Sequence, residues 1–173
     1  AANSASVFAR DKTAIGKALK VEDPSAAISK ALDSPKALDA LTDFAKAARK
    51  SKNPQEAMEG LRNGIVEALL KRAERPIRGT PDSFISGNQL EELLTTKLGG
   101  RTLGDALKKS GIFRPDDYKA FNQLMREAQK MERAIDHPGA MDELLGQGSL
   151  LMDLLLRITG ANIGGASGLA KAT

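Results

Sequence analysis

Residues able to carry acid–base or metal chemistry are few in this sequence. His137 is the only histidine, and there is no cysteine. An activated nucleophile needs a base, and a chain without cysteine has no disulfides and no thiolate metal sites. His137 precedes Pro138 in a predicted helix-terminating turn, where an imidazole near the last carbonyls has an ordinary structural role. We therefore predict neither catalysis nor metal binding at His137.

Adjacent acidic residues are a second possible source of acid–base chemistry. The pairs are Glu22-Asp23, Glu91-Glu92, Asp116-Asp117 and Asp142-Glu143. Neighbouring side chains point about 100° apart on a helix, and most of these pairs lie near a predicted helix start, where carboxylates complement the macrodipole. No phosphate-binding glycine loop follows a strand, and Gly99-Gly100 is predicted to end a helix. The sequence thus predicts a protein that is not an enzyme and binds no cofactor or metal.

Two groups of basic side chains could contact nucleic-acid phosphates. They are Lys46, Arg49, Lys50 and Lys52 in the first cluster, and Lys71, Arg72, Arg75 and Arg78 in the second. Grouped lysine and arginine are the electrostatic footprint of DNA binding. Each cluster also falls at the end of a predicted helix, where carbonyl dipoles favour cations, and aromatic residues for base stacking are missing from both. Both interpretations stay open.

The composition predicts an all-α fold. Hydrophobic residues make up 41% of the 173 positions, but only five are Phe, one is Tyr and none is Trp. A core of Leu, Ile, Met and Ala suits close-packed helices, because the residues that favour strands are too sparse for several strands. We expect an irregular bundle of about seven to eight helices, as one domain or as two small lobes.

Local sequence signals place the expected helices. Asp23-Pro24, Ser34-Pro35 and Asn53-Pro54 each set a short polar residue before a proline, which is typical of a helix start. The expected helices cover residues 24–32, 35–50, 54–75, 89–98, 103–109 and a long stretch opened by Pro115. Prolines and glycines between residues 75 and 88 indicate a connection. The expected organisation is a lobe over residues 1–76, a loop over 77–88, a second lobe over 89–148 and a carboxyl-terminal segment over 149–173.

The carboxyl-terminal segment combines a leucine-rich stretch with regularly spaced glycines. Gly160, Gly164 and Gly168 recur every four residues, and glycine costs roughly 0.8–1 kcal/mol relative to alanine inside a helix. Close approach of another backbone would compensate for that cost. We therefore predict a protein interface formed by Leu151, Leu154, Leu155, Ile158, Gly160, Gly164 and Gly168.

A transmembrane interpretation of this segment fits less well. On a helical wheel the glycines share a stripe with Asp153 and Arg157, opposite the leucines. Each of those charges would cost about 2.5–3.5 kcal/mol at a bilayer centre. Docking against protein is the favoured interpretation, and a flexible tail beyond Gly164 is the alternative.

Residues 34–70 and 138–168 resemble the carboxyl-terminal regions of large internal virion proteins of tailed bacteriophages. There, a helical region ends in a leucine-rich segment followed by small residues of the kind found from Ile158 to Gly168. The resemblance implies a structural protein of the virion, packaged near the portal and ejected with the genome. It implies partners that are further copies of the chain or a neighbouring virion protein, with a transient contact to the host envelope. A basic helical nucleic-acid-binding module that contacts DNA is the alternative function.

Overall fold

The structure is a computed structural model in which residues 16–77 and 83–135 are described. Residues 16–19 form a helical turn. The helices that follow are α2 (Pro24–Leu32), α3 (Ala37–Arg49), α4 (Pro54–Ala73), α5 (Gly87–Thr95), α6 (Leu103–Lys109) and α7 (Pro115–Ile135). Two short antiparallel hairpins interrupt them, β1 (Glu74–Pro76) with β2 (Ser83–Ile85) and β3 (Lys97–Leu98) with β4 (Arg101–Thr102). The predicted all-α class is confirmed.

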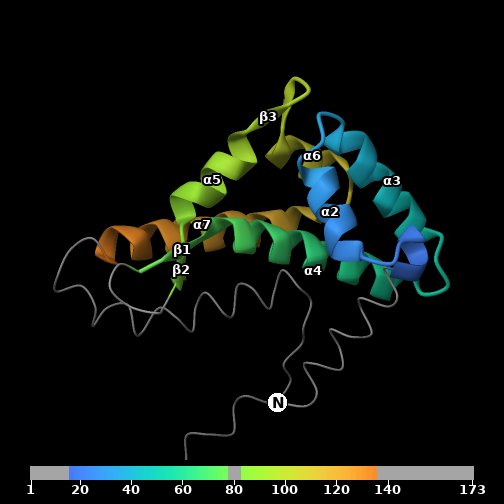
Figure 1. Ribbon diagram of the computed structural model, residues 1–173, viewed down its shortest axis with the longest axis horizontal. Coiled ribbons are helices and arrows are strands. Elements are labelled where there is room, and N and C mark those ends of the chain that lie inside the picture. The colour runs from blue at the N-terminus through green and yellow to red at the C-terminus, as the bar shows by residue number, and fades with distance from the viewer. Residues whose placement is uncertain (1–15, 78–82, 136–173) are drawn as a thin grey trace, which may run out of the picture.

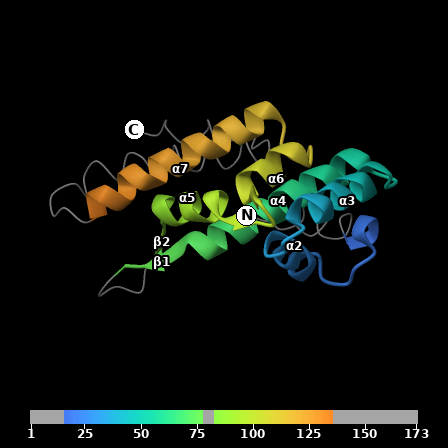
Figure 2. The ribbon, with the colours of Figure 1, turned by 90° about the horizontal axis from the view of Figure 1, so that it is seen from above.

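Helix α4 occupies the centre of this arrangement. It runs along the length of the molecule (Figure 1), with α3 packed on its first half and with α2 and α5 packed against its second half. Viewed from above, α7 forms one long edge and α2 lies at the opposite edge (Figure 2). Small and apolar side chains lie around most of the circumference of α4, and among its buried residues are Ala57, Leu61, Ile65 and Leu69. A helix apolar on most sides is buried among others, which explains its central place.

One hydrophobic core runs through the described residues. Its buried members extend from Ile28 in α2 to Leu124 in α7 and form a single cluster. Residues on both sides of the predicted 77–88 connection contribute to that cluster, since Leu61 and Leu90 both belong to it. The connection therefore joins two parts of one core.

The predicted connection is also more ordered than a plain loop. Residues 83–85 within it pair with residues 74–76 just before it as the β1–β2 hairpin, with Glu74 opposite Ile85 and Arg75 opposite Phe84. The Ser86 amide donates to the Ala73 carbonyl oxygen at 2.9 Å, which holds the end of α4 beside the start of α5. The side chain of Ile85 packs against the core, so the hairpin is anchored by the apolar residue placed at its end.

The three proline-led helix starts have different outcomes. Asp23 caps α2 as predicted, because its carboxylate accepts from the amides of Ser25 and Ala26 at 3.0 and 3.1 Å. The start at Pro35 is wrong by two residues: α3 begins at Ala37. The reason is that the Ser34 hydroxyl accepts from the Lys36 amide at 3.1 Å, which forms a turn instead of a cap.

The third start, at Pro54, is correct in position but not in mechanism. Helix α4 begins at Pro54, yet the Asn53 side chain accepts no backbone hydrogen bond. Its amide nitrogen instead donates to Glu56 Oε2 at 3.0 Å. The interaction is between two side chains, so the first turn of α4 relies on proline and on the acidic residue near its start.

The prediction that Gly99-Gly100 ends a helix is wrong. Helix α5 ends at Thr95, and the two glycines form the turn between β3 and β4. Their φ angles are 59° and 86°. Two consecutive residues with positive φ are what a tight hairpin turn requires, and glycine adopts that conformation without a steric penalty. A side chain at Gly99 would collide with the Pro35 carbonyl oxygen. The hairpin therefore packs closely against the residues that precede α3.

The later helices follow their predicted starts closely. Helix α6 covers residues 103–109 as expected, and α7 begins at Pro115. On α7, Phe121, Leu124 and Ala128 are buried, at the three-four spacing of an amphipathic helix. Phe121 also packs against Phe113, with 6.4 Å between the ring centroids, so the loop before α7 supplies a core residue of its own.

Candidate functional site

Two charged groups whose pKa values are shifted form a buried ion pair between α4 and α7. Arg62 and Asp117 have side chains that are 7% and 4% exposed, and Arg62 Nε lies 3.3 Å from Asp117 Oδ2. The same guanidinium donates to the Ile112 carbonyl oxygen through Nε and Nη2, at 3.3 and 3.2 Å. Arg62 thereby ties the central helix to the start of α7.

Asp117 also closes the first turn of its own helix. Its Oδ2 accepts from the backbone amide of Arg114 at 2.9 Å and from Arg114 Nε at 3.0 Å. An acid that reaches back from the first turn to the amide preceding the helix is half of a capping box. The sequence predicts a helix-start role for this acid, and the structure adds the pair with Arg62, which no spacing in the sequence indicates.

The electrostatics of the pair favour a permanently charged tie over acid–base chemistry. Burial acts to raise the pKa of the Asp117 carboxyl, but the hydrogen bonds from Arg114 and the charges of Arg62 and Arg114 outweigh it, so the pKa is lowered. Burial lowers the pKa of the Arg62 guanidinium, partly opposed by the charge of Asp117. An arginine nevertheless stays protonated in a protein. With every contact directed to another helix or loop, the pair has a structural role.

The first predicted basic cluster lies where α3 ends. Lys46, Arg49 and Lys50 are exposed there. Arg49 is already used, since its Nη2 donates to the Gly111 carbonyl oxygen at 3.0 Å and so ties α3 to the loop after α6. Lys46 approaches Asp43 at 3.5 Å, with both side chains largely exposed. Of these three side chains, within the described residues, Lys50 is unpaired, Lys46 is in an exposed ion pair and Arg49 is engaged.

The second cluster lies at the other end of α4. Arg72 makes a two-pronged contact to Asp33, at 2.8 and 2.9 Å, and also donates to the Ser29 carbonyl oxygen at 3.2 Å. Arg75 donates to the Gln89 side chain. Lys71 is exposed, and Arg78 lies outside the described residues. Because α4 has 20 residues, the two clusters are about 30 Å apart along it and do not merge into one surface.

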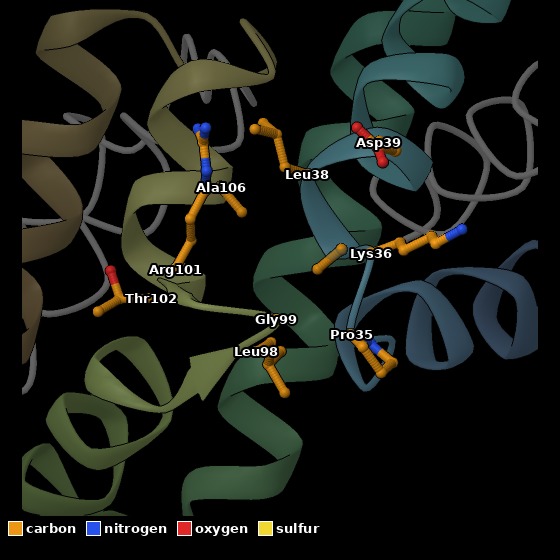
Figure 3. Close-up of a pocket in the computed structure, with 10 residues that line it drawn as sticks. Pro35, Lys36, Leu38, Asp39, Leu98, Gly99, Arg101, Thr102 and Ala106 are labelled. Carbon is orange, nitrogen blue, oxygen red and sulfur yellow. The ribbon is translucent and has the colours of Figure 1, made fainter.

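A shallow hollow of about 280 Å³ lies between the start of α3, the β3–β4 hairpin and α6 (Figure 3). The charged ends of Lys36 and Arg101 point away from each other. The hydroxyl of Thr102 is used as a cap, because it accepts from the Asp105 amide at 3.1 Å. The ten residues that line this hollow therefore bring no nucleophile and base together.

The remaining predicted site residues cannot be placed. The interface formed by Leu151, Leu154, Leu155, Ile158, Gly160, Gly164 and Gly168 lies outside the described residues, as does His137. Within residues 16–77 and 83–135, no three His, Asp or Glu side chains are arranged to hold a metal ion. Among the helices of that same part of the chain, none combines the length and apolar character needed to cross a bilayer.

Comparisons with known proteins add no relative. No protein-family model, no curated protein and no solved structure matches this chain.

Proposed function

We propose that this chain is a non-catalytic structural module that works by packing against further copies of itself through its carboxyl-terminal segment. The observation that carries the proposal is the division of apolar residues in that segment. Leu151, Leu154 and Leu155 lie on one side of a helical wheel, and the four-residue glycine spacing lies on the other. In a helix with such a pattern, the leucine face can be buried against protein. The glycine face allows the backbone of a second copy to approach closely.

The folded body supports this proposal by having a core of its own. The described residues from Ile28 to Leu124 already form one continuous apolar cluster. Their buried charged groups, Arg62 and Asp117, tie helices together. A self-contained body followed by an amphipathic segment is an arrangement that suits assembly.

The resemblance to internal virion proteins of tailed bacteriophages gives this module a context. We place it in the virion, as a part of a protein that is ejected with the genome, with a neighbouring virion protein as a further partner. Mass spectrometry of purified particles tests the context. If particles made by the genome that encodes the chain lack its peptides, the virion assignment fails.

The assembly proposal is tested by replacing Gly164 with leucine. Sedimentation equilibrium of the purified chain should show oligomers for the wild type and a shift towards monomer for Gly164→Leu, because the larger side chain separates the backbones. Gly165→Leu is the matched control, since it points about 100° away. Circular dichroism should show an unchanged helical body in both variants. A wild-type chain that stays monomeric at its solubility limit would overturn the proposal.

A further inference from the structure

The outer face of α7 carries a row of basic side chains, which we call the basic stripe. It consists of Lys119, Arg126, Lys130 and Arg133, all exposed. Their spacing places them within an arc of about 60° on the helix. The row extends about 21 Å along the helix axis. It is directly opposite the buried face of Phe121, Leu124 and Ala128, so packing of α7 on the core turns the whole row to solvent.

The acidic residues of α7 do not cancel this row. Asp117 is buried against Arg62. Glu132 is turned towards α5, where its carboxylate accepts from the Ser86 hydroxyl at 2.8 Å and from the Asn88 amide at 3.1 Å. Asp116 is exposed in the first turn, and Glu127 lies on one flank. The fold thus converts a helix with equal numbers of acids and bases into one with a predominantly positive outer face.

Three of the four cations have no partner within the described part of the chain. Lys119, Arg126 and Arg133 make no ion pair or hydrogen bond there with their side chains, whereas Lys130 lies 2.9 Å from Glu127 and stays 63% exposed. On the opposite flank, the Glu91 carboxylate of α5 is already engaged, because it accepts from the Gln129 side chain at 2.7 Å. The stripe is therefore available to an external anion.

We propose that the basic stripe binds the phosphate backbone of double-stranded DNA without reading its sequence. Its length allows contact with several phosphates, which follow one another every 3.4 Å of helix axis on each strand. No aromatic side chain belongs to the stripe, so base stacking contributes nothing to the binding. Phosphate contacts alone position a protein on DNA and carry no sequence information.

A lipid surface fits the same charges less well. A helix that binds a membrane buries its apolar face between the headgroups. On α7 that face, with Phe121 and Leu124, is committed to the protein core. The stripe offers positive charge but no apolar face that could insert into lipid. This favours binding to a polyanion in solution over binding to a membrane. This site is independent of the carboxyl-terminal interface proposed above.

The test compares two variants with the same loss of charge. Lys119→Gln, Arg126→Gln and Arg133→Gln are combined in one, and Lys46→Gln, Lys50→Gln and Lys71→Gln in the other. Binding to two short DNA duplexes of unrelated sequence is followed by fluorescence anisotropy over a range of salt. The wild type should bind both duplexes alike, with log K falling against log salt with a slope of about −3 for three to four phosphates. For the stripe variant, the dependence of log K on log salt should be much weaker. For the control variant, the slope should equal that of the wild type.

Each of the following outcomes would overturn the proposal that the basic stripe binds DNA. An equal loss in both variants would mean that only net charge matters, and a loss confined to the control would assign DNA to the cluster residues. No DNA binding by the wild type, or binding only to vesicles that contain anionic lipid, would also reject it. Circular dichroism of both variants, matching the wild type, ensures that a loss of binding reflects the surface. Self-association is measured separately, so failure here leaves the assembly proposal intact.

Discussion

The basic residues that are clustered in the sequence and those that are aligned in space behave differently. In the two sequence clusters the arginines within the described residues are occupied: Arg49 binds the loop after α6, and Arg72 binds α2. In the basic stripe of α7, the members are three or more positions apart along the chain, yet Arg126 and Arg133 have no partner among the described residues. Proximity in sequence therefore did not identify the free arginines of the described residues.

The difference has a simple physical origin. An arginine at a helix end lies beside neighbouring helix ends and loops, whose carbonyls and carboxylates its long side chain can reach. Arg72 meets both kinds of acceptor, in Ser29 and Asp33. A cation on the outer face of an edge helix and away from its ends, such as Arg126, has mainly its own helix nearby. Position relative to the core thus decides which basic residues tie the fold and which remain available.

The largest expected effect is on Arg62, the most completely engaged cation. Replacing it with methionine keeps much of the volume but removes one partner of the buried Asp117 carboxylate. Breaking a buried pair in this way lowers the free energy of unfolding by about 3–5 kcal/mol. We expect a decrease at the low end of that range because Arg114 still binds Asp117. Urea unfolding followed by circular dichroism measures the change. A loss below about 1 kcal/mol would show that the tie contributes little.

An intermediate effect is expected at Arg72. Its side chain is 25% exposed and that of Asp33 is 67% exposed, so water screens the pair. Arg72→Met should lower the free energy of unfolding by about 1 kcal/mol, within the range for exposed pairs. The same unfolding experiment applies, with Lys71→Met as the control on the neighbouring exposed position. Equal effects at the two positions would contradict a tie between α4 and α2.

The smallest effect on stability is expected for the basic stripe. The combined change of Lys119, Arg126 and Arg133 to glutamine should alter the free energy of unfolding by no more than about 0.5 kcal/mol, as is usual for surface positions. Urea midpoints of the variant and the wild type provide the comparison. A loss as large as that at Arg72 would mean that the stripe supports the fold and is not free for a ligand.

Glycine gives a second contrast between pattern and packing. The four-residue spacing of Gly160, Gly164 and Gly168 predicts a close backbone approach, and those residues lie outside the described part. A close approach is found instead at Gly87, where an added Cβ would lie 2.6 Å from the Met125 carbonyl oxygen of α7. Gly87 belongs to no spaced pattern, so only the packing of α5 on α7 identifies its role.

The sequence by itself determined the helical class and the starts at Pro24, Pro54 and Pro115. These depend on interactions within a few residues, namely proline geometry, capping and apolar periodicity. The Arg62–Asp117 pair, the glycine hairpin against Pro35 and the positive outer face of α7 were decided by the tertiary structure. Each depends on which groups from distant parts of the chain meet, and a local pattern does not specify those meetings.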